Sequence, residues 1–226
     1  MRLILASASP RRAELLRAAR IEFDVLPAAV DESALSDETP EQHVRRLADA
    51  KARAVQTQAG NRPVLSADTV VVVDGRILGK PAGDADARRM LRMLSGRSHE
   101  VMTGVCLMYG ASVKGEGGKG QGTGGRDQGT GGKEQGEGDR IRTTPTVETG
   151  TATAVAVTTV EFAPLTEAEI AWYVASGEPA DKAGAYAIQG LASRFVTRID
   201  GSYSNVVGLP VAVVYHLCTR AGLLIS

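Results

Sequence analysis

The 226-residue sequence has few aromatic residues and no excess of charge of either sign. Aromatic side chains make up 4% of the chain, and 26 basic residues balance 26 acidic ones. Nucleic-acid-binding proteins usually present a basic surface, often with aromatic side chains on which bases stack. The composition therefore argues against DNA, RNA or an anionic membrane as a partner. We expect the partner to be a small molecule.

Cysteines and long apolar runs are also scarce. Cys106 and Cys218 lie far apart, in apolar contexts and without metal-ligand spacing, so we expect buried free thiols rather than a disulfide. No apolar run approaches the roughly 18 residues that a membrane span requires, and the N-terminus does not resemble a signal peptide. These absences predict a cytoplasmic protein, and 43% hydrophobic residues in a chain of this length suffice for a sizeable core.

The first distinctive stretch is Leu3–Leu16, LILASASPRRAELL. Its apolar start predicts a short strand, and a tight loop with Ser7 and the N-cap Ser9 leads to a proline that begins a helix. Arg11 and Arg12 then fall in the first helical turn, where the helix dipole favours an anion. Free N–H groups, serine hydroxyls and guanidinium groups together predict a phosphate site. The alternative is that both arginines extend into solvent.

Two charged residues interrupt apolar patterns. Thr39 begins a capping box and a helix expected to end near Gly60, and Lys51 lies on the apolar stripe of that helix. Its ammonium either reaches solvent along the stripe or points into a cleft. Asp68 lies in the middle of Pro63–Val73, the most strand-like run of the chain. A buried carboxylate must be paired, hydrogen-bonded or bound to a cation, so Asp68 is either a structural ion pair or a functional group.

Further polar side chains lie in predicted loops, several of them beside glycines that let a backbone approach a ligand. They are Glu32, Lys80, Asp181, Lys182 and Gln189. The basic residues could meet phosphates, whereas Asp68 and Glu32 could hold Mg²⁺, which favours one or two carboxylates plus substrate phosphates. This combination predicts phosphoryl or nucleotidyl chemistry. His99 is expected to be a structural or surface histidine.

Residues 112–150 are rich in glycine and have almost no large apolar side chains. Such a segment cannot bury enough surface to offset its ordering entropy, so we expect a disordered surface insertion between two strands that still pair. Elsewhere strands and helices alternate, which favours a mixed α/β sheet with flanking helices in one domain over residues 1–226. Strands are expected at 3–5, 23–27, 63–73, 76–78, 101–109, 152–162 and 194–199, and helices at 39–60, 84–94, 166–177 and 210–222, besides the helix that begins at residue 10. Residues 178–190 are too rich in charged and small side chains to be core and are expected to form a loop, and 201–205 are expected to form a polar turn.

The motifs of the chain resemble those of the Maf proteins, nucleoside triphosphate pyrophosphatases related in fold to the inosine triphosphatase group. The similarity covers nearly the whole chain outside 112–150. The matching motifs are SASPRR (7–12), VDE (30–32), ADAK (48–51), SADT (66–69), GKP (79–81), TGV (103–105), DKAGAYAIQG (181–190), GSY (201–203) and NVVGLP (205–210). The resemblance implies a curved mixed sheet and a substrate cleft between two lobes.

The resemblance also implies a reaction, in which the bond between the α- and β-phosphates of dTTP or UTP is hydrolysed to the monophosphate and pyrophosphate. Asp68 matches the general base, and a divalent metal, Mg²⁺ or Mn²⁺, is expected at Glu32 and Asp68. Arg12, Thr69 and Gln189 match positions that tune base choice. The expected substrate contacts are Ser7, Ser9, Arg11, Arg12, Lys51, Thr69, Lys80, Asp181, Lys182 and Gln189.

Two alternative functions remain at this level, and a homodimer is left open. One is a nucleotide-binding regulator of septum formation that hydrolyses little, and the other is a pyrophosphatase for 7-methyl-GTP. The intact Asp68 with surrounding cations favours an enzyme, because a protein that only binds nucleotides does not need a candidate base in a buried strand. Base preference rests on the resemblance alone.

Overall fold

The structure is a computed structural model that describes residues 2–110, 140–141, 146–148 and 150–223. Most of the segment 112–150, expected to be a disordered insertion, lies outside the described residues. Within them, nine strands form one sheet. They are β1 (Leu3–Leu5), β2 (Phe23–Val25), β3 (Val64–Val73), β4 (Arg76–Leu78), β5 (Ser98–Met108), β6 (Arg140–Ile141), β7 (Thr146–Glu148), β8 (Thr151–Phe162) and β9 (Val196–Asp200).

The sheet is mixed, with the order β2-β1-β3-β5-β8-β6. Strand β1 runs parallel to both β2 and β3, whereas β3, β5 and β8 pair antiparallel along most of their lengths. Strands β4, β7 and β9 pair at the sides of these long strands. The hairpin of β5 and β8 ends where the Tyr109 N–H donates to the Gly150 carbonyl at 2.9 Å. The predicted mixed sheet is confirmed.

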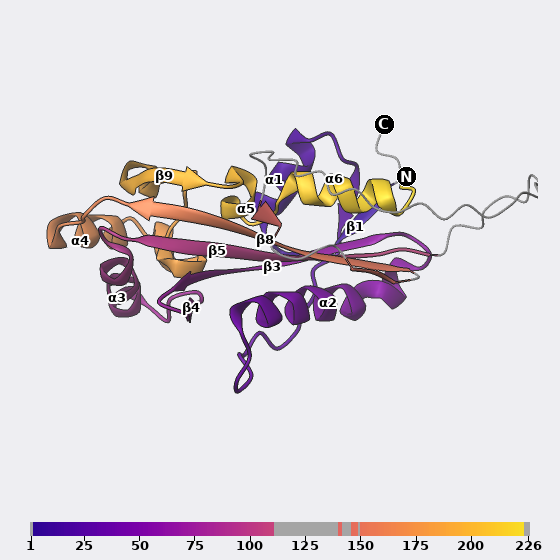
Figure 1. Ribbon diagram of the computed structural model, residues 1–226, viewed down its shortest axis with the longest axis horizontal. Helices are drawn as coiled ribbons and strands as arrows, with labels where there is room; N and C mark the ends of the chain where they lie inside the picture. Colours follow the sequence, from indigo (N-terminus) through magenta and orange to yellow (C-terminus); the bar gives the residue numbers. More distant parts are fainter. Residues whose placement is uncertain (1, 111–139, 142–145, 149, 224–226) are drawn as a thin grey trace, which may run out of the picture.

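Helices cover the sheet on both faces (Figure 1). They are α1 (Pro10–Ala18), α2 (Pro40–Ala59), α3 (Asp84–Leu94), α4 (Glu167–Ala175), α5 (Tyr203–Val207) and α6 (Val211–Arg220), with the 3₁₀ turns η1 (Glu178–Asp181), η2 (Ala183–Ala185) and η3 (Leu191–Phe195). Helix α2 lies on one face, and α1 and α6 lie on the other, toward the same end of the sheet. Helices α3 and α4 lie at the opposite end.

This arrangement gives the molecule two lobes that share the long strands. One apolar cluster packs α1 and α6 against β1 and the sheet, with Leu5, Leu16 and Leu217 fully buried. Another packs α3 and α4 together around Leu91 and Tyr173. Two smaller clusters lie under α2 and on the neighbouring strand faces. The cleft described below lies between these lobes.

Helix α2 approaches the sheet unusually closely at Gly104 of β5. A Cβ atom at this position would lie 2.3 Å from the Val44 carbonyl oxygen, so only glycine fits there. The Ser66 hydroxyl of β3 donates to the Ala48 carbonyl of the helix at 2.5 Å. These contacts bring the next helical turn, which carries Lys51, directly over the middle of β3.

Local signals in the sequence are confirmed at several helix starts and corrected at others. Thr39 and Thr166 both form the predicted capping boxes. Ser9 occupies the N-cap position of α1, but its side chain makes no capping hydrogen bond. The turn predicted after Gly201 instead leads directly into helix α5, because the Ser202 hydroxyl accepts from the Asn205 N–H.

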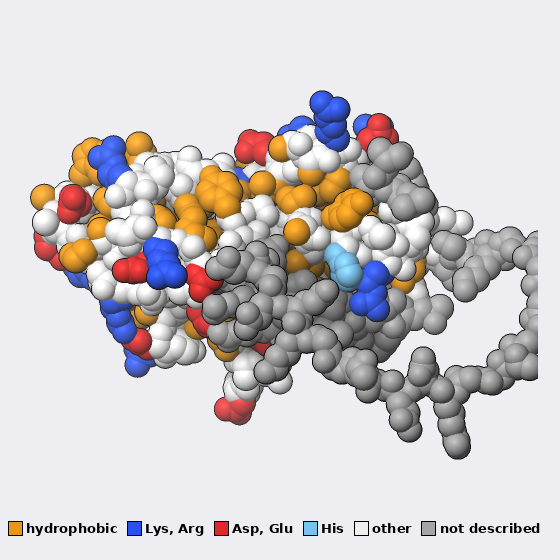
Figure 2. Space-filling model, turned by 45° about the horizontal axis from the view of Figure 1, so that its top comes forward, with side chains coloured by type: hydrophobic (Ala, Val, Ile, Leu, Met, Phe, Trp, Pro, Cys, Tyr) orange, Lys and Arg blue, Asp and Glu red, His pale blue; other side chains and the backbone are white. Residues whose placement is uncertain are grey.

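Other expectations concern segments outside the regular elements. The segment 178–190, predicted to be a loop, contains the short 3₁₀ turns η1 and η2. Cys106 and Cys218 are buried free thiols, as predicted. The described residues include no helix that is both long and apolar enough to cross a membrane. On the face shown in Figure 2, basic and acidic side chains are interspersed among the described residues rather than gathered into one basic patch.

Candidate active site

A cleft of about 480 Å³ lies between the two lobes. Its walls come from the loop before α1, the first turn of that helix, the middle of β3, the loop after β4, the segment 180–189 and the end of α5. Every candidate site residue selected from the sequence lines it. These residues are Ser7, Ser9, Arg11, Arg12, Glu32, Lys51, Asp68, Thr69, Lys80, Asp181, Lys182 and Gln189.

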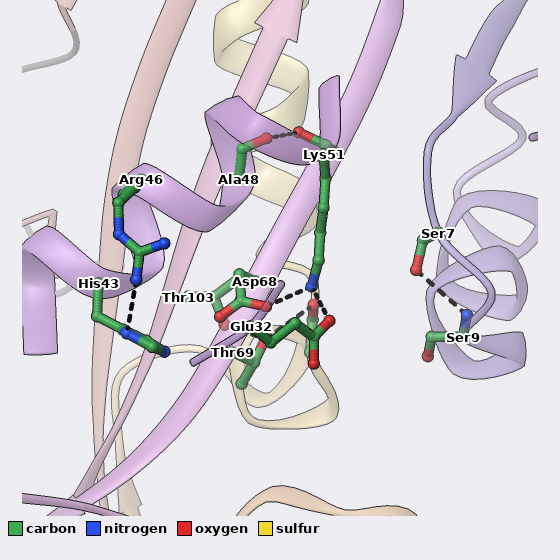
Figure 3. Close-up of polar contacts among 12 residues, drawn as sticks. Ser7, Ser9, Glu32, His43, Arg46, Ala48, Lys51, Asp68, Thr69 and Thr103 are labelled. Atoms are coloured by element: carbon green, nitrogen blue, oxygen red, sulfur yellow. Dashed lines mark hydrogen bonds and ion pairs between the residues drawn. The ribbon is translucent and has the colours of Figure 1, made fainter. Parts of the chain in front are cut away.

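A lysine joins two carboxylates at the centre of the cleft (Figure 3). The Lys51 Nζ lies 2.6 Å from Asp68 Oδ1 and 2.6 Å from Glu32 Oε1. Lys51 and Asp68 are both 7% exposed. The Lys51 ammonium therefore points into the cleft instead of extending to solvent, and it compensates the carboxylate that the sequence places inside an apolar strand.

Glu32 reaches this centre from the loop between β2 and α2. Its side chain is 46% exposed and also lies 3.6 Å from Lys80 Nζ. Burial opposes ionisation of Glu32, but the hydrogen bond and charge of Lys51, with a further contribution from Lys80, lower its pKa below the usual value. Glu32 is therefore ionised at neutral pH.

The loop that carries Glu32 is anchored to α2 by an ion pair that sequence reasoning missed. The Arg46 guanidinium donates to Glu38 Oε1 at 2.6 Å and to the Ser33 carbonyl at 3.0 Å. The hydrogen bond from Arg46 is the largest cause that lowers the pKa of Glu38 to about 2, although burial opposes it. His43 contacts the same carboxylate at 3.0 Å. In the sequence, Glu38 only precedes a helix cap, which gives no signal of this role.

Arg12 is held inside the cleft wall by three separate elements. Its Nε donates to the Gly208 carbonyl at 2.8 Å, and its two terminal nitrogens donate to Ser7 Oγ and Thr69 Oγ1 at 3.1 Å each. Burial is the main cause that lowers the pKa of Arg12, and the charge of Asp68 opposes this. The solvent-exposed alternative is excluded for Arg12. The sequence could not identify Gly208 as a partner of Arg12, because its backbone carbonyl is an acceptor that every residue has.

Arg11 lies at the mouth of the cleft with two residues of the segment 180–189. Its guanidinium is 3.4 Å from Asp181 Oδ2, and Lys182 Nζ is 2.5 Å from Asp181 Oδ1. The hydrogen bond from Lys182 is the largest cause that lowers the pKa of Asp181. Near them, the Ser9 N–H donates to Ser7 Oγ at 3.2 Å. One exposed carboxylate therefore holds two cations in place beside the start of α1.

Apolar side chains also line the cleft. They are Val71, Val101, Tyr186, Ile188, Val206 and Val207. The Tyr186 hydroxyl lies 2.8 Å from His99 Nε2, and His99 itself is buried behind the wall and does not line the cleft. The expectation that His99 is structural is therefore confirmed. A cleft lined by both cations and apolar side chains suits a ligand that combines phosphates with a flat organic group.

Comparisons with known proteins identify the family of the chain. The family model described as "Maf-like protein" matches residues 2–123 and 135–221. The dTTP/UTP pyrophosphatase of Koribacter versatilis (strain Ellin345) is 49% identical over 224 residues, which cover 99% of this chain and 96% of that protein. The dTTP/UTP pyrophosphatase of Anaeromyxobacter dehalogenans (strain 2CP-C) is 48% identical over 98% of this chain and 94% of its own.

Among solved structures, the Staphylococcus aureus Ham1 protein aligns with 97% of this chain and 99% of its own, at 13% identity and a TM-score of 0.46.

The family match spans nearly the whole described chain and includes each motif that lines the cleft. The identity to two curated relatives is close to one half over almost their entire lengths. The chain therefore belongs to the family of Maf-like proteins.

Proposed function

We propose that this protein is a nucleoside triphosphate pyrophosphatase that hydrolyses dTTP and UTP to the monophosphate and pyrophosphate. The main support is the buried Asp68, held by Lys51 in a cleft that is lined by both cations and apolar side chains. Relatives that match almost the whole chain are named dTTP/UTP pyrophosphatases. A buried carboxylate positioned by one ammonium is suited to take a proton from water.

In the proposed reaction, Asp68 is the general base. Its carboxylate accepts a proton from a water molecule, whose oxygen attacks phosphorus while the phosphoanhydride bond between the α- and β-phosphates breaks. Lys51 orients Asp68 through the 2.6 Å contact. Arg11, Lys80 and Lys182 line the same cleft and would stabilise the negative charge of the triphosphate as pyrophosphate leaves.

A divalent cation, Mg²⁺ or Mn²⁺, is part of the proposal. Glu32 and Asp68 are brought together on the Lys51 ammonium, and the described residues place no third histidine, cysteine or acidic side chain in a cluster with them. Two carboxylates completed by substrate phosphates are a donor set that Mg²⁺ favours, so these residues fit the ion and would hold it. When bound, the cation neutralises phosphate charge and polarises the bond that breaks.

We also propose that Arg12, Thr69 and Gln189 select the base. Arg12 donates to Thr69 Oγ1 at 3.1 Å, which fixes one polar edge of the cleft wall, and the exposed Gln189 lines the same cleft. Ser7 and Ser9 would contact phosphate near the start of α1. We also propose that residues 1–226 form one domain. That the protein forms a homodimer stays a prediction.

The test is a product assay on a nucleotide panel with Mg²⁺ or Mn²⁺. We expect dTTP and UTP to yield monophosphate and pyrophosphate, and Asp68→Asn to lose most turnover while still folding. Asp49→Asn is the matched control, because Asp49 lies on α2 outside the cleft lining and pairs with Arg53. Orthophosphate as the first product, or full activity of Asp68→Asn, would contradict the mechanism.

The same panel separates the alternative functions. A preference for 7-methyl-GTP over dTTP would favour the other pyrophosphatase specificity. Tight nucleotide binding without hydrolysis would favour a regulator. The panel therefore assigns the substrate class whichever result is obtained.

A further inference from the structure

The segment from Ala187 to Leu191 forms part of the cleft wall and is held from behind by two residues that do not line the cleft. Ala187, Ile188 and Gln189 line the cleft. The two supporting residues are Tyr173 of α4, which is fully buried, and Glu178 at the start of η1. Neither residue lines the cleft, and neither has a role in the proposed reaction.

One hydrogen bond joins these two residues to each other, and three join them to the ends of the segment and to the residue that follows it. The Tyr173 hydroxyl donates to Glu178 Oε1 at 2.8 Å and accepts from the Ala187 N–H at 3.2 Å. Glu178 also accepts from the backbone N–H groups of Leu191 at 2.9 Å and Ala192 at 3.3 Å. One tyrosine–carboxylate pair therefore fixes both ends of the stretch that presents Gln189.

The backbone is adapted to this pair. A Cβ atom at position 190 would lie 2.2 Å from Glu178 Oε2, so the glycine leaves the space that the carboxylate occupies. Burial, and then the hydrogen bond to Glu178, raise the pKa of Tyr173, which keeps the hydroxyl protonated as a donor. The Tyr173 ring packs edge-on against Phe195, with ring centroids 5.4 Å apart. The pair is thus held by contacts with the surrounding lobe.

We propose that Tyr173 and Glu178 are positioning residues that determine substrate selection by fixing the Ala187–Leu191 segment and, with it, Gln189. The inference rests on the proposed function. Asp68, Lys51 and Glu32 belong to β3, α2 and the loop before α2, and the ion pairs that join them do not involve Tyr173 or Glu178. Loosening the segment should therefore weaken discrimination between bases and raise KM, whereas kcat for the preferred nucleotide should change little.

The test compares Tyr173→Phe with the wild-type protein, because phenylalanine keeps the buried ring and removes only the hydroxyl. We expect the ratio of kcat/KM for dTTP over CTP to fall roughly tenfold, as for the loss of one or two hydrogen bonds. Glu178→Gln, which keeps one acceptor oxygen, should fall between the wild type and Glu178→Ala. A graded loss of this kind is not expected from a general loss of stability.

Ile170→Val is the matched control, since it trims a buried side chain of the same helix and apolar cluster but removes none of the hydrogen bonds of the pair. Its melting temperature should fall by a similar amount, and its selectivity ratio should stay at the wild-type value. An unchanged ratio in Tyr173→Phe, or an equal loss in Ile170→Val, would overturn the inference.

A binding measurement separates this inference from the proposed function. The probes are the α,β-methylene analogues of dTTP and CTP, titrated by calorimetry. If the wild type discriminates between the analogues but does not hydrolyse dTTP, the proposed function fails, and loss of discrimination in Tyr173→Phe still supports the positioning role. If the wild type does not discriminate between the analogues, the inference is overturned.

Discussion

Acidification is expected to destabilise this protein through one buried histidine. His99 of β5 is 3% exposed, and burial lowers its pKa from 6.5 to about 4. Its Nδ1 has no hydrogen-bond partner among the described residues, so little favours a charged ring there. Below pH 6.5 the unfolded chain binds a proton that the folded protein rejects. The stability contributed by the neutral ring is therefore complete above pH 6.5 and is lost as the pH falls toward 4.

The size of the effect follows from the width of this pH window. The two pKa values differ by about 2.5 units, and each unit corresponds to about 1.4 kcal/mol, so the free energy of unfolding should fall by roughly 3 kcal/mol. Urea unfolding at several pH values between about 4 and 7 would measure it. The reference is His99→Gln, whose neutral amide can still bond the Tyr186 hydroxyl but does not titrate.

The comparison of the wild type with His99→Gln isolates the contribution of His99 to the pH dependence of the free energy of unfolding. Every other titratable group is present in both, so the difference between their stability curves reports His99 alone. An NMR titration of the His99 ring should give a midpoint near 4. Parallel stability curves, or an NMR midpoint near 6.5, would refute the reasoning.

Two further predictions concern the sheet. Deletion of Val113–Thr149 removes β6 and β7 from the edge of β8, so the melting temperature should fall. The value of kcat/KM for dTTP should not change, because no described residue of this segment lines the cleft. Steady-state kinetics test this, and a large loss of rate would show that the segment supports the site. Gly104→Ala should lower the free energy of unfolding by about 1–3 kcal/mol, since α2 must move to admit the methyl group. In urea unfolding, a loss no larger than that of Gly110→Ala, which has open space around it, would contradict this.

The sequence predicts the elements well where a local signal decides them. Capping boxes at Thr39 and Thr166 and the apolar run of β3 each depend on a few neighbouring residues, and the structure confirms them. Lys51 and Asp68 stood out because each carries a charge where the pattern is apolar. The chemistry of burial then required a partner for Asp68, although the pattern could not name it.

Pairings between distant segments could not be read from the sequence. Arg12 was expected to bind an anion at the start of a helix. Its guanidinium donates hydrogen bonds to Ser7, Thr69 and the carbonyl of Gly208, which lies 196 residues further along the chain. Glu178 looked like a solvated residue of a charged loop, yet it accepts hydrogen bonds from Tyr173 and two backbone N–H groups. Such partners are set by tertiary packing, which places groups together irrespective of their separation along the chain.

The end of the β5–β8 hairpin has a practical consequence. Because Tyr109 and Gly150 are hydrogen-bonded neighbours, the end of β5 and the start of β8 lie side by side, and the short strands β6 and β7 of the connection pair along β8. None of the described residues 102–110 or 150–162 lines the cleft. The entropy of closing a loop grows only slowly with its length, so this junction tolerates large changes in what it connects. A folded reporter domain whose own termini lie close together could therefore replace the connection between β5 and β8. Because the cleft would keep its lining residues, ligand binding in the cleft would show whether the fusion protein folds correctly.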